Sequence, residues 1–254
     1  MKTHANLNLV LGFMIACSLF GSLVILLMVA YPPMTMQDFF WRKPLVGSIF
    51  FLICAGGSLL AVTPRNCSMA HETQMVKTRK DLDVNTGFPV TSEGHHPNCG
   101  RFSAHTIRFR KTSYCAACTG LLVGSVAVMI VTALYFFLGL NSESVGFPAI
   151  VVGQVGLGSG LMQFRFAGWT RFAANLLFVL GGFFMLMGVD QLVGSVFVDI
   201  YVMGLIVLWI LTRVMISQWD HHRTCISCGF FCGTERKVSV LASATRPVQS
   251  ADDD

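Results

Sequence analysis

Six long apolar runs constrain the fold of this 254-residue chain more than any other feature. They occupy residues 7–30, 44–62, 116–140, 147–164, 172–189 and 193–216. About 20 apolar residues in a helix are enough to cross the hydrocarbon core of a bilayer. The composition agrees, since 54% of the residues are hydrophobic and only 12% are charged, whereas soluble domains carry about 25%. We therefore predict an all-α, polytopic membrane helix bundle with about six transmembrane helices.

These runs divide the chain into four parts. Residues 1–63 hold two helices, 64–114 form a Cys/His-rich loop, 115–219 hold four helices, and 220–254 form a Cys-rich tail with a disordered end. A lipoprotein-like signal around Cys17 is the less favoured interpretation of the first run, because the apolar residues continue well beyond that cysteine. The loop buries too little apolar surface to fold alone, so we expect a metal or packing against the helices to stabilise it.

Basic residues are distributed very unevenly between the two sides of the predicted bundle. If the N-terminus is cytoplasmic, sixteen of the 18 Lys and Arg residues lie on the cytoplasmic side, and only Arg42 and Lys43 lie outside. Short cytoplasmic loops are enriched in Lys and Arg. We therefore predict a multi-pass protein of the plasma membrane with both termini and the 64–114 loop in the cytoplasm, where thiols stay reduced and clustered Cys and His favour metal binding or redox chemistry.

The first Cys/His cluster lies in the 64–114 loop and at the start of the third run. Cys115 and Cys118 are spaced so that both thiolates can reach one ion. A single histidine nearby is more often a surface residue than a ligand, but the density of Cys and His favours a metal site. The candidate ligands of this cluster are His95, His96, Cys99, His105, Cys115 and Cys118.

The second cluster follows the last apolar run, on the same predicted side. Its candidate ligands are His222, Cys225, Cys228 and Cys232. With Cys115 and Cys118, the Cys225/Cys228 pair could complete one four-thiolate site between the third and sixth spans. Zinc is the metal that we expect, and an iron–sulfur cluster is the alternative, because both use four thiolates.

Two features within the apolar runs bear on packing and function. Gly156 and Gly160 have the small-xxx-small spacing that brings transmembrane helices close together. Asp199 lies inside the sixth run, where an ionisable residue is a functional candidate, or else a residue near the outer interface.

The stretch from His95 to Gly124 resembles an uncharacterised family (a domain of unknown function) of prokaryotic multi-pass membrane proteins. That family has a Cys/His-rich segment followed by Cys-Ala-x-Cys-Thr-Gly, here Cys115 to Gly120. Its later Gly-x-x-Gln and Arg-x-x-x-Asn patterns look like Gly160 to Gln163 and Arg171 to Asn175. The resemblance implies a membrane bundle and a special status for the two cysteines, and it implies no particular activity.

These observations favour a membrane protein whose cytoplasmic Cys/His metal site is structural, acting as a scaffold or binding a partner. The alternative is an enzyme or electron carrier, either a membrane thiol oxidoreductase or an iron–sulfur protein, so enzymatic activity stays open. The expected partners are the lipid bilayer and another membrane protein or a second copy of the chain. The basic strip from Arg108 to Lys111 suits lipid headgroups better than nucleic acid, because it lies four residues from a span.

Overall fold

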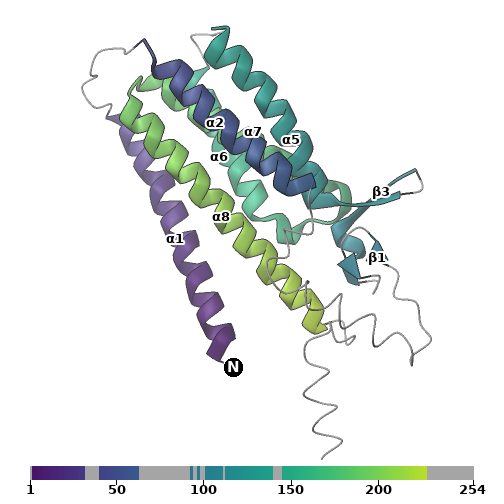
Figure 1. The fold of residues 1–254 in the computed structure, drawn as a ribbon. Coiled ribbons are helices and arrows are strands. Elements are labelled where there is room, and N and C mark those ends of the chain that lie inside the picture. The colour runs from purple at the N-terminus through teal and green to yellow at the C-terminus, as the bar shows by residue number, and fades with distance from the viewer. Residues whose placement is uncertain are drawn as a thin grey trace, which may run out of the picture.

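The computed structural model describes residues 2–31, 40–62, 92–93, 96–97, 101–110, 112–139 and 145–227. These residues form a helix bundle with two small hairpins at one end (Figure 1). The long helices are α1 (Lys2–Ala30), α2 (Arg42–Val62), α5 (Ala116–Thr132), α6 (Gly146–Leu161), α7 (Gly168–Leu192) and α8 (Val196–Ser227). A π-helical segment, η2 (Ala133–Phe137), extends α5. The predicted all-α membrane bundle is confirmed.

Five helices are long and apolar enough to cross a membrane, and they are α1, α2, α5 with η2, α7 and α8. The predicted fourth span, 147–164, is shorter than expected. Its helix, α6, has 16 residues and ends at Leu161, so it is about 24 Å long. The short 3-10 helix η3 (Gln163–Arg165) follows it. The sixth predicted span instead continues past Ile216, because α8 ends only at Ser227.

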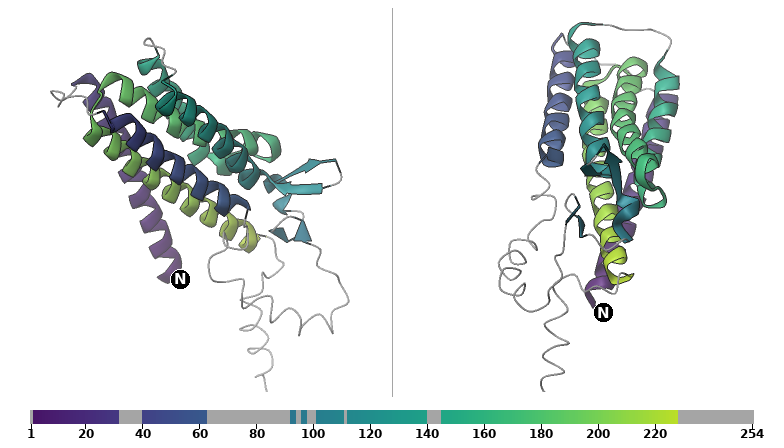
Figure 2. Two further views of the ribbon diagram at one scale, coloured as in Figure 1. Left: turned by 45° about the horizontal axis from the view of Figure 1, so that its top comes forward. Right: turned by 90° about the vertical axis from the view of Figure 1, so that its right-hand side faces the viewer.

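The helices run alternately up and down, so both described ends of the chain lie at one end of the bundle (Figure 1). We call this the loop end, because α1 begins there, α8 ends there and the hairpins lie there. The opposite end, where α2 begins, is called the far end. Figure 2 shows the same arrangement from two further directions.

Helix α7 is the central helix, since it packs against α5, α6 and α8. Its side chains Met185, Leu186 and Val189 are fully buried, and they meet Val202 and Trp209 of α8 in the apolar core. Helix α1 packs mainly on α8 and leaves large apolar side chains such as Leu19 and Phe20 exposed. An apolar outer surface of this kind suits contact with lipid chains.

Glycines allow α6 and α7 to approach closely. A Cβ atom on Gly156 would lie 2.5 Å from the backbone oxygen of Leu177, and one on Gly181 would lie 2.8 Å from the backbone oxygen of Gly153. A Cβ atom on Gly160 would collide with the side chain of Phe178. The predicted packing role of Gly156 and Gly160 is therefore confirmed.

The described part of the 64–114 loop contains two antiparallel hairpins, although no strand was predicted there. Strands β1 (Ser92–Glu93) and β2 (His96–Pro97) form the smaller one. The larger one pairs β3 (Thr106–Phe109) with β4 (Thr112–Cys115), and the 3-10 helix η1 (Arg101–His105) precedes it. Both η1 and β3 pack on α7. The described part of this segment therefore packs against the helices, which is one of the two expected means of stabilisation.

Candidate functional site

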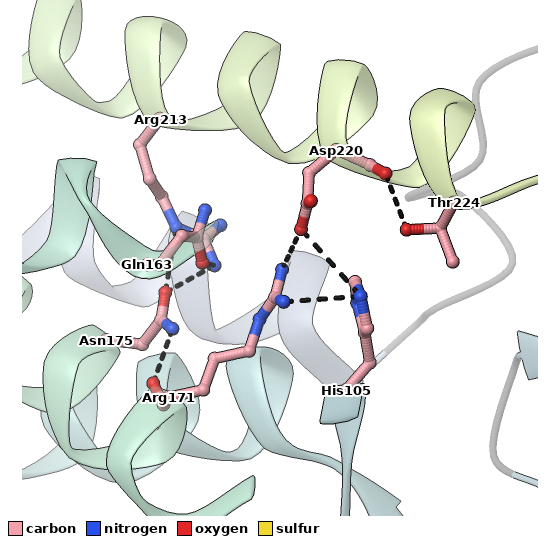
Figure 3. A network of polar contacts seen from close by, with 7 residues as sticks. All are labelled: His105, Gln163, Arg171, Asn175, Arg213, Asp220 and Thr224. Carbon is pink, nitrogen blue, oxygen red and sulfur yellow. Dashed lines mark hydrogen bonds and ion pairs between the residues drawn. The ribbon is translucent and has the colours of Figure 1, made fainter. Parts of the chain in front are cut away.

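The loop end holds a buried polar network between α7, α8 and the segments η1 and η3, shown in Figure 3. Long apolar helices rarely carry buried charges, and such charges are functional candidates when they do. We call this set the loop-end network, and its members are His105, Gln163, Arg171, Asn175, Arg213, Asp220 and Thr224.

Arg171 in the first turn of α7 joins this helix to α8. Its side chain is only 2% exposed, and its Nη2 donates to Asp220 Oδ2 at 2.9 Å. Asp220 is held in turn by α8, where Thr224 Oγ1 donates to its backbone oxygen at 2.9 Å. Charged groups can be buried only when they are paired and hydrogen-bonded. The ion pair therefore sets how α7 and α8 meet at this end.

His105, the last residue of η1, contacts the same ion pair. Its Nε2 lies 3.4 Å from Arg171 Nη1 and 3.8 Å from Asp220 Oδ2. A guanidinium group can only donate, so His105 Nε2 accepts in the hydrogen bond with Arg171. The adjacent positive charge disfavours a metal ion at this nitrogen, which counts against the predicted ligand role of His105 through Nε2. The geometry assigns His105 an anchoring role instead.

Aromatic rings complete this anchor. The Phe102 ring is buried and lies 5.2 Å from the His105 ring and 5.5 Å from the His221 ring of α8, measured between centroids. The His105 and His221 rings are 5.4 Å apart in an edge-to-face arrangement, which is favourable for aromatic pairs. Segment η1 is thus fixed on α8 by ring packing and on α7 by Arg171.

Deeper in the bundle, Arg213 of α8 is held by two carboxamides. Its Nε and Nη2 donate to Asn175 Oδ1 at 3.0 and 2.6 Å, and Nη2 also donates to Gln163 Oε1 at 3.3 Å. Asn175 Nδ2 donates to the backbone oxygen of Arg171 at 2.7 Å. Gln163 Nε2 and Arg171 Nε are buried and have no hydrogen-bond partner among the described residues.

The thiol pair begins where the β3–β4 hairpin meets α5. Cys115 is the last residue of β4, pairs with Thr106 and is the N-cap residue of α5. Cys118 lies in the first turn of that helix, and residues three apart share a helix face. Both cysteines are partly exposed, and neither forms a disulfide with another of the cysteines whose side chains the structure describes. Cys115 pairs with Thr106, and Thr106 directly follows His105 of the loop-end network. The thiol pair is therefore separated from that network by a single pair of strands.

The other predicted ligands are placed less completely. Cys225 and His222 belong to the last turns of α8, and His96 belongs to β2, but only their backbones are described. His95, Cys99, Cys228 and Cys232 lie outside the described residues. The helix backbone thus brings Cys225 to the same end of the bundle as Cys115 and Cys118. Whether these cysteines share one ion stays a prediction.

Among the described side chains, no group of three or more Cys, His, Asp or Glu is arranged to hold a metal ion. The donor chemistry of Cys115 and Cys118 suits two thiolate ligands of a soft metal, because one ion can be reached from a strand end and the following helical turn. Any further ligands would have to come from residues outside that described set.

A second buried charge cluster lies at the far end. Arg42 Nη1 is 2.7 Å from Asp190 Oδ1 and 2.8 Å from Asp199 Oδ2, so one nitrogen meets carboxylates from α7 and α8. Tyr135 donates to Asp190 Oδ2 at 2.7 Å, and Lys43 Nζ is 3.8 Å from the same oxygen. Asp199, the functional candidate of the sixth run, therefore pairs with Arg42 and is fully buried.

The sequence interpretation missed the roles of several charged residues. Arg213 lies inside an apolar run, and this ionisable position was a signal that could have marked it. Arg42 and Arg171 follow or precede apolar runs closely, so they were counted as loop cations. Asp220 was assigned to the Cys-rich tail, at the start of the second Cys/His cluster.

Comparisons of the chain with protein-family models, curated proteins and solved structures found no match. The family resemblance from His95 to Gly124 therefore stays a prediction.

Proposed function

We propose that this protein is a membrane scaffold or partner-binding protein whose Cys/His segment is stabilised by a structural metal ion, zinc, on the cytoplasmic side. The observation that carries the proposal is the position of Cys115 and Cys118. They stand close together and partly exposed at the junction of β4 and α5. Two thiolates in this arrangement form half of a tetrahedral zinc site.

The loop-end network supports a structural role for the thiol pair. A structural metal works best where the chain around it is already held, since ligands must be brought together at an entropic cost. Here the hairpin that ends at Cys115 is fixed by His105, Phe102 and the Arg171–Asp220 ion pair. The remaining ligands in this proposal are the second thiol pair, Cys225 and Cys228, because α8 carries Cys225 to the loop end.

When bound, zinc with four protein ligands would crosslink this segment to α8 and would leave no coordination position open for a substrate. The chain's own residues then present a fixed surface at the loop end, formed by the hairpins and the last turns of α8. The expected partner of such a surface is another membrane protein or a second copy of the chain. Both termini on the cytoplasmic side and a plasma-membrane location belong to the same proposal, and the asymmetry of basic residues supports them.

A thiol oxidoreductase is the second candidate, and the same Cys115/Cys118 geometry favours it. Redox cysteine pairs also have two intervening residues and stand at the start of a helix, where backbone N–H groups stabilise a thiolate. In that function the pair would alternate between dithiol and disulfide, with the electrons passed to an acceptor such as a quinone. A structural metal would block this cycle, because thiolates bound to zinc are not available as nucleophiles.

Replacing one thiol separates the two functions. For Cys118→Ser, a structural metal predicts a lower melting temperature and faster protease cleavage of the 64–114 segment. Cys17→Ser, a cysteine in α1 far along the chain from the site, is the matched control and should behave like the parent. If Cys118→Ser is as stable and protease-resistant as the parent while thiol-dependent electron transfer disappears, the oxidoreductase function replaces the scaffold.

A further inference from the structure

The β3–β4 hairpin leads directly into a candidate membrane span. Its last residue, Cys115, directly precedes Ala116, the first residue of a candidate span that ends at Phe137. A strand that continues into a span lies at the level of the lipid headgroups. Figure 1 shows the hairpin directed sideways from the loop end, away from the helices. It therefore extends along the membrane surface instead of rising from it.

One face of the hairpin is apolar and aromatic. The strand register places Ile107 opposite Tyr114 and Phe109 opposite Thr112, and alternate residues of a strand share a face. Ile107 is buried against the bundle, whereas Phe109 is 57% exposed and Tyr114 is 45% exposed. The apolar face thus begins in the protein and continues beyond its edge. Exposed aromatic side chains are typical of the interface between lipid chains and headgroups.

The turn of the hairpin is basic. Arg108 and Arg110 are exposed, Lys111 follows in the sequence, and no Asp or Glu occurs between Thr106 and Cys115. Arg110 has a positive φ of 55°, which is uncommon for a residue other than glycine. Its guanidinium carbon lies 5.8 Å from the centroid of the Phe109 ring. The positive charge is thereby held directly beside the aromatic face.

We propose that the tip of the β3–β4 hairpin binds the phosphate groups of anionic phospholipids in the leaflet at the loop end. Arg108 and Arg110 would meet the headgroups while Phe109 and Tyr114 lie at the interface. The charge complements an anionic leaflet, and α5, which follows the hairpin directly, also exposes apolar side chains such as Val123 and Ile130. This inference goes beyond the scaffold function and does not depend on a metal.

The test compares lipid binding by the full chain and by matched charge variants. The purified protein is reconstituted in nanodiscs of phosphatidylcholine with and without phosphatidylglycerol, and the lipids retained on the protein are measured by native mass spectrometry. The parent should retain phosphatidylglycerol in preference to phosphatidylcholine, and added salt should weaken this preference. The double variant Arg108→Gln/Arg110→Gln should reduce it on the order of tenfold.

Two further variants make the result specific. Arg165→Gln/Arg223→Gln removes two other exposed charges at the loop end and should keep the parent's preference. Arg108→Lys/Arg110→Lys keeps the charge and should also retain it. A parent without preference, an equal loss in the Arg165/Arg223 control, or a loss in the lysine variant would overturn the proposal. Binding of an RNA oligonucleotide that depends on Arg108 and Arg110, in place of the lipid preference, would also overturn it.

Discussion

Arg171 Nη2 of α7 lies 2.9 Å from Asp220 Oδ2 of α8, and this largely buried ion pair joins the central helix to the last turns of α8, the longest helix that the structure describes. The pair also contacts His105, the residue that anchors the segment carrying the thiol pair. Besides the ring contacts among Phe102, His105 and His221, the Arg171 guanidinium group therefore joins α8 to the Cys/His segment. Removing it should affect both.

The Arg171→Gln variant tests this connection. It leaves the Asp220 carboxylate, whose side chain is 14% exposed, without its charged partner. We expect a loss of roughly 2–3 kcal/mol in the free energy of unfolding, since one partner of a largely buried ion pair is removed. The melting temperature should fall, and protease should cut the segment around η1 sooner. The control is Arg223→Gln, which replaces an exposed arginine of α8 close to Asp220 in the sequence and should change neither measurement.

At the far end, Arg42→Met should be more destabilising than a change at Lys43. Arg42 is buried and serves two carboxylates, whereas the Lys43 side chain is 37% exposed and lies 3.8 Å from Asp190. Losing Arg42 should cost about 3–5 kcal/mol, and Lys43→Gln less than about 1 kcal/mol. Thermal unfolding of both variants in the same detergent measures the difference. Equal effects would show that the buried geometry at Arg42 does not control stability.

A combined variant separates the charge from the packing at this site. In Arg42→Met/Asp190→Asn/Asp199→Asn, no carboxylate is left buried without a partner. Replacing a whole buried ion cluster is often much less destabilising than removing one member. We therefore expect the triple variant to unfold at a higher temperature than Arg42→Met alone. A triple variant that is less stable by the sum of its separate effects would contradict this account.

Glycine substitutions in α6 provide a matched pair for the packing of α6 on α7. Gly156→Val should lower the melting temperature strongly or prevent folding, because its Cβ would lie 2.5 Å from the backbone oxygen of Leu177, which cannot move independently. Gly158→Val is the control, since no atom lies within 4 Å of a Cβ at Gly158. The two variants have the same propensity change, so any difference in stability reports the helix contact.

The orientation can be tested with epitope tags inserted at Ser142 and at Ser243. Sixteen of 18 basic residues lie on the side that we assign to the cytoplasm. An antibody applied to intact cells should therefore bind the tag at Ser142, in the connection between η2 and α6, and should reach the tag at Ser243 only after permeabilisation. The reverse result would place the thiols on the oxidising side and favour disulfide chemistry.

The helices could be predicted from the sequence because hydropathy reports directly which segments cross a bilayer. The close approach of α6 and α7 was also readable, since the spacing of Gly156 and Gly160 is local. Hydropathy shows where the bilayer ends and not where a helix ends, so the extension of α8 through Asp220 was missed. Strands β3 and β4 were read as a basic strip, although Thr106-Ile-Arg-Phe alternates as a strand does.

The polar networks were not predictable from local patterns. Arg42 and Asp199 are 157 residues apart in the sequence, and Arg171 and Asp220 are 49 apart. Arg42, Arg171 and Asp220 stand beside apolar runs, where a charged residue at the headgroup level is the usual interpretation, and only Asp199 lies inside one. Only the packing of the helices shows that these charges turn inward and pair. The thiol pair, by contrast, could be found because only two residues separate its cysteines in the sequence.

The metal content of the purified full-length protein tests the central claim most directly. We expect about one zinc per chain, bound through thiolates, and no absorption in the visible range. The Cys115→Ser/Cys118→Ser variant should lose this metal, whereas Cys17→Ser should retain it. A preparation of the parent that contains no metal and yet stays folded, or a brown protein with iron and sulfide, would contradict the structural zinc site.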